Sequence, residues 1–423
     1  MTTEQTLSAP GRAAEKFWFN PKAASYNADP YPHFKRLREE DPVHRSAMGV
    51  WFVGKYDHVR SVLKDRRFSV QDIPGQLRRK NAILATKRVT ESQPSNLDYL
   101  IANSQHWFAF LEPPDHTRLR SLVSKAFGQK SAESMRPYVR KCAQELLGRV
   151  RAHGRMDVMK DFACILPLNV IATMLGVPPA DFPRLVAWTE RLARIFDPLT
   201  SLEELATLDH ASQEFMEYLR MLIALRRAQP EDDLLSALIA AQDESGRLSE
   251  SELVSVCILI FGAGEETMVN LIGNGTLALI RHPDQMEFLR AHPEVMPKAV
   301  EEFLRYDAPL QMTSRTALHD AELGGKQIRK GDQLYLALAS GNRDPEQFAA
   351  PDELDVTREK NHHLSFAAGH HLCVGAPLAR VEAQEAFGVM LETLRDMELA
   401  TDSLGWRDHT VLRGLTALPV TFT

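Results

Sequence analysis

Apolar residues recur every three or four positions along most of the chain between His116 and Arg305, which predicts helices. The spacing is clearest in three stretches, Tyr138 to Val150, Phe162 to Leu175 and Leu202 to Arg227. A longer stretch from about Glu250 to Ile280 is apolar at most positions and predicts one long helix. Helices are therefore expected to dominate the middle of the chain.

Strand signals occur towards the two ends of the chain. Short runs rich in β-branched and aromatic residues predict strands at Val50 to Val53, Met312 to Leu318, Gln333 to Leu338 and Leu412 to Thr423. Asp29-Pro30-Tyr31-Pro32 opens a short helix that runs through Leu37, because proline suits the first turn of a helix. We therefore expect a mainly α-helical fold with small β-sheets, with residues 1–28 as a flexible N-terminal tail and residues 29–423 as a single domain.

One long segment lacks a clear period. Gln71 to Ser104 is predicted to be a functional loop, since loops of this length in compact domains tend to be lids or binding segments. It carries a basic cluster of Arg78, Arg79, Lys80, Lys87 and Arg88. A solvated surface loop is the plainer interpretation of these charges. Binding of an anionic substrate or an acidic carrier protein is the alternative.

Composition narrows the class of protein. The chain has 423 residues, 44% of them hydrophobic, so it can bury a large core. Its formal net charge of −6 argues against nucleic acid as a partner, because nucleic-acid-binding domains normally carry a basic excess. The four cysteines are widely spaced, which fits a reducing cytosol better than a disulfide framework. We read no signal peptide in the first residues and no apolar window long enough for a membrane span.

One cysteine stands out by its surroundings. Cys373 lies in the run Phe366-Ala367-Ala368-Gly369-His370-His371-Leu372-Cys373-Val374-Gly375-Ala376-Pro377, ahead of a helical pattern. Gly369 and Gly375 permit positive φ, so backbone amides can converge on the sulfur, and the following helix N-terminus favours an anion there. These features suit a thiolate ligand of a haem iron. An inert buried cysteine and a zinc site made from His362, His363, His370, His371 and Cys373 are the alternatives.

A second pattern lies inside the long predicted helix, at Leu259-Ile260-Phe261-Gly262-Ala263-Gly264-Glu265-Glu266-Thr267. The small residues Gly262, Ala263 and Gly264 open the wall of the helix and leave room for a ligand such as dioxygen. Glu266 and Thr267 supply an acid and an alcohol that can relay protons during O–O cleavage. A close helix crossing with a chance Glu-Thr pair is the alternative, and the separation from Cys373 favours the relay.

The run around Cys373 resembles the haem-binding signature of the cytochrome P-450 family. Every anchor position of that signature is matched, by Phe366, Gly369, His371, Cys373 and Gly375. Ala367 departs from the glycine that many members carry there, and we expect this to change loop packing more than ligation. The helix motif resembles the family's oxygen-binding motif. The resemblance implies the cytochrome P-450 fold, with haem b buried between a long central helix and the helix after the cysteine loop.

The resemblance also implies roles for residues whose own patterns are weak. Haem binding would fall to His116, Arg120, Ala263, Gly264, Arg315, Phe366, Gly369, His371, Cys373 and Gly375, with Cys373 as the metal ligand. The substrate pocket would draw on Leu259, Gly262, Leu310, Gln311, Met312, Val411 and Leu412. Glu302 and Arg305 would form a buried structural pair. Taken singly, each of the cations is as readily an ordinary surface charge.

These roles imply a haem-thiolate monooxygenase that activates dioxygen and hydroxylates or epoxidises a lipophilic small molecule, as bacterial members often do in natural-product biosynthesis. Electrons are expected from a ferredoxin and its NAD(P)H-dependent reductase, with Arg118, Lys125 and Arg136 as candidate docking cations. We expect a cytoplasmic monomer without nucleic-acid or membrane partners, whose substrate is free or bound to a carrier protein. A peroxide-driven or radical-coupling haem enzyme and a non-catalytic haem or gas sensor are the rival interpretations.

Overall fold

The computed structural model describes residues 17–70, 72–86, 96–197, 200–245 and 248–423. Its α-helices are α1 (Ala24–Ala28), α2 (Tyr31–Glu40), α3 (Tyr56–Lys64), α4 (Ile73–Thr86), α5 (Asp98–Ser104), α6 (Asp115–Ser124), α7 (Gln129–Arg151), α8 (Leu166–Met174), α9 (Phe182–Leu192), α10 (Leu202–Ala228), α11 (Leu234–Ser245), α12 (Glu250–Arg281), α13 (Pro283–Ala291), α14 (Met296–Tyr306), α15 (Leu338–Gly341) and α16 (Ala376–Thr393). Its strands are β1 (Val43–Arg45), β2 (Trp51–Val53), β3 (Phe68–Ser69), β4 (Arg155–Asp157), β5 (Thr313–Ala317), β6 (Ala321–Leu323), β7 (Lys326–Ile328), β8 (Gln333–Leu336), β9 (Glu398–Leu399) and β10 (Pro419–Thr421). The expected mainly helical fold with small sheets is confirmed.

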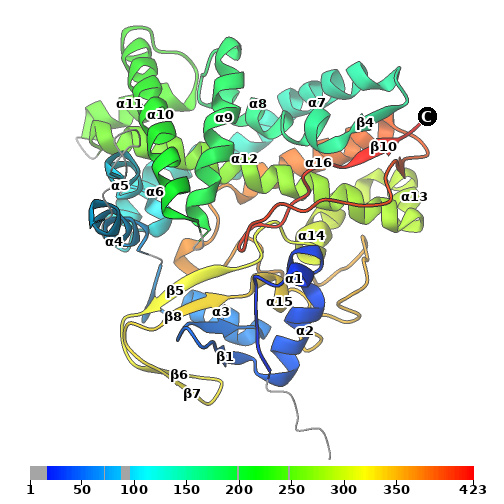
Figure 1. Cartoon of the computed structure of the whole chain (residues 1–423). Coiled ribbons are helices and arrows are strands. Elements are labelled where there is room, and N and C mark those ends of the chain that lie inside the picture. The colour runs from blue at the N-terminus through cyan, green and yellow to red at the C-terminus, as the bar shows by residue number, and fades with distance from the viewer. Residues whose placement is uncertain (1–16, 71, 87–95, 198–199, 246–247) are drawn as a thin grey trace, which may run out of the picture.

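Most helices gather in one part of the molecule, and the largest sheet lies in the other (Figure 1). The long helix α12 crosses the helical part and begins at a capping box, in which the Ser249 hydroxyl accepts from the Glu252 N–H and the Glu252 carboxylate accepts from the Ser249 N–H. It ends at His282, ahead of Pro283, which begins α13. α16 packs against α7, α12 and α14, so the loop before α16 is held next to α12.

The largest sheet has the strand order β1-β2-β8-β5-β3 and is antiparallel except for the β2–β8 pair. β5 pairs with β8 from Thr313 opposite Leu336 to Thr316 opposite Gln333. α15 packs against α2 and α3 beside this sheet (Figure 1). Strands β9 and β4 flank β10 in a second sheet at the C-terminal end of the chain, and β6 and β7 form a hairpin.

The N-terminal boundary predicted from the sequence is wrong for the residues that the structure describes. Residues 17–28 are not a flexible tail, because Phe19 and Tyr26 are buried in one cluster with Phe34 and Phe52. The rings of Phe19 and Phe52 lie 4.8 Å apart between centroids. The aromatic residues of this segment, Phe17, Trp18, Phe19 and Tyr26, follow neither a helical nor a strand period. The burial of Phe19 and Tyr26 therefore depends on contacts with residues elsewhere in the chain. Residues 1–16 lie outside the described residues.

The segment Gln71 to Ser104 is not a continuous loop, because it contains α4 and α5. Ile73, Leu77 and Leu84 are buried, and their spacing of four and seven residues is that of one helix face. The helical period was not recognised because the basic residues Arg78, Arg79 and Lys80 interrupt the apolar positions. Lys87 and Arg88, like the rest of residues 87–95, lie outside the described part of the chain. Strand β4 was also not predicted, since three residues are too few to show an alternating pattern.

Only α12 among the helices of the described chain is long and apolar enough to pass for a membrane span, and 78% of its most apolar window is buried inside the protein. This burial is what a core helix of a globular fold requires. The sequence analysis missed this window. Its burial identifies α12 as a core helix, so its length and composition are only weak evidence for membrane insertion.

The N-terminus of α5 depends on a buried carboxyl group of α10. The backbone N–H of Leu100 donates to Asp209 Oδ1 at 2.8 Å, and Asp209 is buried. Burial raises the pKa of Asp209 to about 6, against the opposing effect of this hydrogen bond. The carboxyl group of Asp209 therefore binds its proton more tightly in the folded protein than in the unfolded chain.

We expect the free energy of unfolding to fall as the pH rises from about 4 through 6, because the folded protein binds this proton more tightly than the unfolded chain. Asp209→Asn keeps an oxygen acceptor for Leu100 and removes the charge. It should be more stable than the parent at pH 7.5 by on the order of 1–2 kcal/mol and should lose this part of the pH dependence. Denaturant unfolding of both proteins at several pH values measures the difference. An unchanged pH dependence in the variant would contradict this account of Asp209.

Candidate functional site

An apolar cavity of about 320 Å³ lies between α12 and the loop of residues 366–377, which we call the cysteine loop. Leu259, Ala263, Gly264 and Thr267 of α12 line it on one side. The cysteine loop contributes Phe366, His371, Cys373 and Gly375, and nearby segments contribute Arg120, Leu310 and Arg315. The predicted cysteine-loop and helix motifs, which are far apart in the sequence, thus line one cavity.

Cys373 lies just before α16, which begins at Ala376. The first backbone N–H groups of a helix have no partner within the helix, so they are available to the sulfur. The N–H groups of Gly375 and Ala376 donate to its sulfur, and its own N–H donates to the Phe366 carbonyl at 2.9 Å. Burial raises the pKa of the Cys373 thiol, while these two amides and the guanidinium of Arg120 lower it. The backbone therefore offers a thiolate two hydrogen bonds, and a metal ion would complete its deprotonation.

Cationic and imidazole side chains meet at the edge of the apolar cavity. His116 and Arg120 lie one turn apart on α6, and Arg120 Nη2 donates to the Leu372 carbonyl at 2.6 Å, which ties α6 to the cysteine loop. Arg315 of β5 is buried, and desolvation lowers its pKa to about 10. Among the described residues, neither ring nitrogen of His116 or of His371 has a hydrogen-bond partner. Buried donors of this kind require an acceptor, and the carboxylates of haem fit them.

The conformation of the cysteine loop depends on two residues with positive φ. Gly369 has φ +77°, and a Cβ atom there would lie 2.6 Å from the Leu63 carbonyl oxygen. The loop therefore passes so close to the backbone at the C-terminal end of α3 that only glycine fits. Ala367 has φ +59°, which is unusual for a residue with a side chain. We expected Ala367, in place of the usual glycine, to change the packing of the loop. In the structure it instead holds the backbone in a strained conformation.

Ala367→Gly should relieve this strain and leave the fold unchanged. The left-handed conformation costs a non-glycine residue roughly 1–2 kcal/mol, part of which glycine gives back through its more flexible unfolded chain. We expect a net stabilisation of about 0.5–1 kcal/mol. Thermal unfolding of parent and variant measures it, and a lower midpoint for the variant would contradict the assignment of strain.

The acid and the alcohol of the α12 motif face different surroundings. Thr267 lines the apolar cavity and its hydroxyl donates to the Ala263 carbonyl at 2.9 Å. Glu266 is buried and lines a separate polar cavity of about 250 Å³, where its Oε1 lies 3.0 Å from Arg407 Nη1. The other residues that line the polar cavity are Arg194, Asn270, Asp408, His409, Leu412 and Gly414. Adjacent positions on α12 therefore contact two cavities.

The whole chain was compared with known proteins. The cytochrome P-450 family model matches residues 43–403. The chain is 37% identical over 419 residues to the polyketide biosynthesis cytochrome P-450 PksS of Bacillus subtilis, covering 97% of this chain and 100% of that protein. It is 38% identical to the cytochrome P-450 monooxygenase PikC of Streptomyces venezuelae, over 93% of this chain and 91% of that protein. The chain belongs to the cytochrome P-450 family.

A solved structure extends the likeness to three dimensions. The P-450 named BioI, in complex with an acyl carrier protein ligated to hexadec-9Z-enoic acid, superposes with a TM-score of 0.86 at 37% identity, covering 95% of this chain and 100% of that chain. This chain accordingly has the cytochrome P-450 fold, uses haem b with an axial cysteine thiolate, and is an oxidoreductase of the monooxygenase class. The residues described above are its own candidates for these tasks.

Several residues predicted for the substrate pocket of this P-450 do not line the apolar cavity. Gln311 is buried and donates through Nε2 to the Ala308 carbonyl, and Met312 and Val411 pack in the cluster beside the N-terminal helices. Leu412 lines the polar cavity, and Gly262 of α12 lines neither cavity. The order of residues in the chain placed them near the pocket, but it does not determine which side of each segment faces the cavity.

Other lining residues of this P-450 were missed by the sequence analysis. Aromatic and aliphatic side chains from four separate segments contribute, among them Phe108, Phe110, Phe127, Ile171 and Leu304. The run Trp107-Phe108-Ala109-Phe110 was a usable signal, since a cluster of aromatic residues ahead of the Pro-Pro turn needs something to pack against. Ile171 and Leu304 lie in ordinary helical patterns, so nothing in the sequence marks them.

The pair Glu302 and Arg305 of this P-450 is fully buried on α14. Arg305 donates to both carboxylate oxygens of Glu302 at 2.7 Å and to the carbonyls of Asn342 and Pro351. Glu302 also accepts from Arg358, from the Asp355 N–H and from Asn361. The pair therefore joins α14 to the segment of residues 342–361 that leads into the cysteine loop.

Two of the three candidate docking cations are engaged within the chain. Arg118 pairs with Asp115 and Glu252, and Arg136 pairs with Glu133 and Glu385. Lys125, just after α6, is exposed. Paired charges are less available to an acidic partner, which makes Lys125 the stronger candidate of the three.

Proposed function

We propose that Cys373 is the axial thiolate and that this P-450 inserts one oxygen atom of dioxygen into an unactivated C–H or C=C bond of a lipophilic natural product. The observation that carries the proposal is that Cys373 and Thr267 line one apolar cavity. When bound, haem b supplies dioxygen binding, electron uptake and oxygen transfer. The residues of this chain orient that group, exclude water and deliver protons.

In this proposal each wall of the apolar cavity has its own task. Gly375 and Ala376 donate to the sulfur and tune its electron donation. His116, Arg120, Arg315 and His371 would hold the two carboxylates of the haem. Ala263 and Gly264 leave space beside α12, and the Thr267 hydroxyl would deliver a proton into the apolar cavity. Glu266 would receive that proton from the polar cavity once its ion pair with Arg407 opens.

The class of substrate is inferred from the lining of the cavity and from the relatives. Phenylalanine, isoleucine and leucine side chains favour a hydrophobic molecule with few polar groups. PksS is named for polyketide biosynthesis, and BioI was solved with an acyl carrier protein. We infer that the substrate is a polyketide or fatty acyl compound of secondary metabolism, free or attached to a carrier protein. The exposed Arg78 and Arg79 of α4 suit an acidic carrier or an anionic substrate, whereas Lys80 already donates to the Thr200 carbonyl.

The electron donor and the compartment follow from the same proposal. A separate ferredoxin with its NAD(P)H-dependent reductase would supply electrons, and exposed Lys125 is the docking cation that the chain leaves available. Such partners place the enzyme in the cytoplasm.

The first experiment is the absorption spectrum of the purified protein after reduction and exposure to carbon monoxide. A strongly red-shifted Soret band in the parent that Cys373→Ser loses is expected, because only a thiolate ligand produces it. An unshifted haem spectrum in a well-folded parent would reject Cys373 as the ligand. The same spectrum in both proteins would assign the thiolate to another cysteine.

Thr267→Ala tests dioxygen activation separately from haem binding. Loss of the hydroxyl should leave the carbon monoxide spectrum unchanged and should reduce the share of NAD(P)H electrons that reach product by at least about 10-fold, with hydrogen peroxide formed instead. The assay compares NAD(P)H consumed with product formed, using the compound of a fatty acid and macrolide panel that shifts the spin state most. Full coupling in the variant would contradict the proton relay assigned to Thr267. A parent that turns over no compound would favour a haem sensor.

A further inference from the structure

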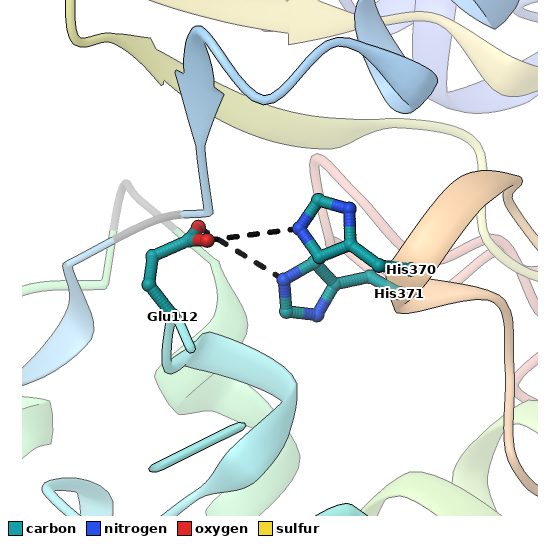
Figure 2. A group of neighbouring side chains, drawn as sticks. All are labelled: Glu112, His370 and His371. Atoms are coloured by element: carbon teal, nitrogen blue, oxygen red, sulfur yellow. Dashed lines mark ion pairs between the residues drawn. The ribbon is translucent and has the colours of Figure 1, made fainter. Parts of the chain in front are cut away.

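A group of potential metal ligands lies at the edge of the apolar cavity, beside the proposed haem contacts (Figure 2). It consists of Glu112, just before α6, and of His370 and His371 in the short 3-10 helix Gly369–His371. His370 Nε2 lies 3.6 Å from Glu112 Oε2, and His371 Nε2 lies 3.9 Å from Glu112 Oε1. Both imidazoles point towards the one carboxylate, as Figure 2 shows.

These distances are longer than those of a hydrogen-bonded ion pair. Ligands of a tetrahedral Zn²⁺ ion with bonds of about 2.0–2.1 Å lie roughly 3.4 Å apart. One potential ligand atom from each of the three residues lies within 4.8 Å of the others, so side-chain shifts of about 1 Å would bring all three into place. Hydrogen-bonded ion pairs are shorter, at about 2.7–2.9 Å. A carboxylate with two imidazoles is also a common ligand set for zinc.

The surroundings hold the ligands in this arrangement. The backbone N–H of Val70 donates to Glu112 Oε1 at 2.9 Å, which fixes the carboxylate and leaves Oε2 towards His370. Arg120 ties the Leu372 carbonyl, next to His371, to α6. A fixed carboxylate and a tied 3-10 helix are the outer contacts that orient ligands in metal sites. The site is thus built from two segments that are already held together.

The imidazole rings of this group are packed together. The His371 side chain is only 7% exposed, and its ring lies 4.2 Å from that of His116 between centroids. Glu112 is the acidic group that faces this cluster of imidazoles and arginines.

The two ring nitrogens of His371 allow it to serve the metal and the haem together. One nitrogen faces Glu112, and the other has no hydrogen-bond partner among the described residues. A histidine that binds a metal usually donates its second N–H to a carboxylate, which fixes the ring. Here the carboxylate would be a haem propionate, so metal binding does not compete with the proposed role of His371.

We propose that Glu112, His370 and His371 bind one Zn²⁺ ion in the haem-loaded enzyme, with water at the fourth position. The zinc site considered from the sequence alone combined these histidines with His362, His363 and Cys373. In the structure His363 instead lies 3.1 Å from Glu301, and the histidine pair meets Glu112. The proposed site therefore keeps His370 and His371 from that hypothesis and replaces its other ligands.

The test is a titration of the holoenzyme, stripped of metals by a chelator, with ZnCl₂ in a calorimeter. We expect one Zn²⁺ per chain, and at least about 10-fold weaker binding in Glu112→Gln and in His370→Asn, since each removes a direct ligand. The haem spectrum recorded beside each titration shows that the variant has kept its cofactor.

His292→Asn is the matched control, because His292 faces Glu294 at 3.3 Å in an exposed pair that lacks a third ligand. It should leave zinc binding unchanged. His370 is not among the proposed haem contacts, so His370→Asn keeps the test valid if Glu112→Gln loads haem poorly. Equal zinc binding in parent, Glu112→Gln and His370→Asn would overturn the proposal, and so would the absence of zinc binding in the haem-loaded parent. Neither result depends on Cys373 or on the proposed monooxygenase activity.

Discussion

Glu302→Ala is expected to lower the free energy of unfolding by about 3–5 kcal/mol, enough to prevent stable folding of many domains. The substitution leaves the guanidinium of Arg305 buried without its carboxylate, together with that of Arg358. It also removes the acceptor of the Asp355 N–H, so the segment before the cysteine loop loses its anchor on α14. Haem loading should fall with stability, because this segment leads into the loop that carries Cys373.

The measurement is denaturant unfolding together with the ratio of haem to protein after expression. Glu359→Gln is the matched control, since Glu359 pairs with Lys298 of the same helix α14 but is 79% exposed. An exposed ion pair contributes at most about 1 kcal/mol, so this variant should behave as the parent does. A Glu302→Ala protein as stable as the control would show that α14 and the 342–361 segment are held by other contacts.

Gly369→Ala is expected to have the second largest effect, a loss of at least about 2 kcal/mol and of most haem binding. The new methyl group would meet the Leu63 carbonyl oxygen at 2.6 Å and the Cα of Lys64 at 3.3 Å, and backbone atoms cannot turn aside as a side chain can. The residue would also keep φ near +77°, which alanine disfavours. The cysteine loop must therefore move away from α3.

Haem content and the carbon monoxide spectrum of Gly369→Ala measure that displacement. Ala367→Gly is the natural comparison, because it changes the same two residue types in the opposite direction within one loop. If both variants kept full haem content, the close approach at Gly369 would not control the position of Cys373.

The sequence was sufficient to predict the elements whose signals are local. The apolar stretch from about Glu250 to Ile280 predicts α12, because most positions of this helix are buried. The cysteine loop is predictable for the same reason, since its glycines and its sulfur act within a few residues of each other. The burial of Phe19 and Tyr26 was not predictable, because it depends on Phe34 and Phe52 and on how the N-terminal helices meet the sheet.

In the candidate site, too, local features could be predicted from the sequence, whereas features that depend on distant contacts could not. Residue types in the α12 motif predict which chemistry is present, but not that Glu266 and Thr267 contact different cavities. That difference arises from the rotation of roughly 100° between neighbouring residues of a helix and from what packs on each side. Met312 and Val411 were misplaced because chain order gives no information on which side of a strand or turn faces the haem. Glu112 was not considered as a partner of the two histidines because they follow it by more than 250 residues.

The division of α12 between two cavities has a consequence for how this enzyme can change over evolution. Side chains that line the apolar cavity, such as Phe108 and Ile171, are not among those that line the polar cavity with Glu266, Arg407 and Asn270. Under the proposed proton relay, mutations can remodel the choice of substrate and leave the residues that supply protons in place, so selection can act on the two traits independently. A scaffold with this property is suited to diversification, because a descendant with a new substrate inherits a working catalytic apparatus.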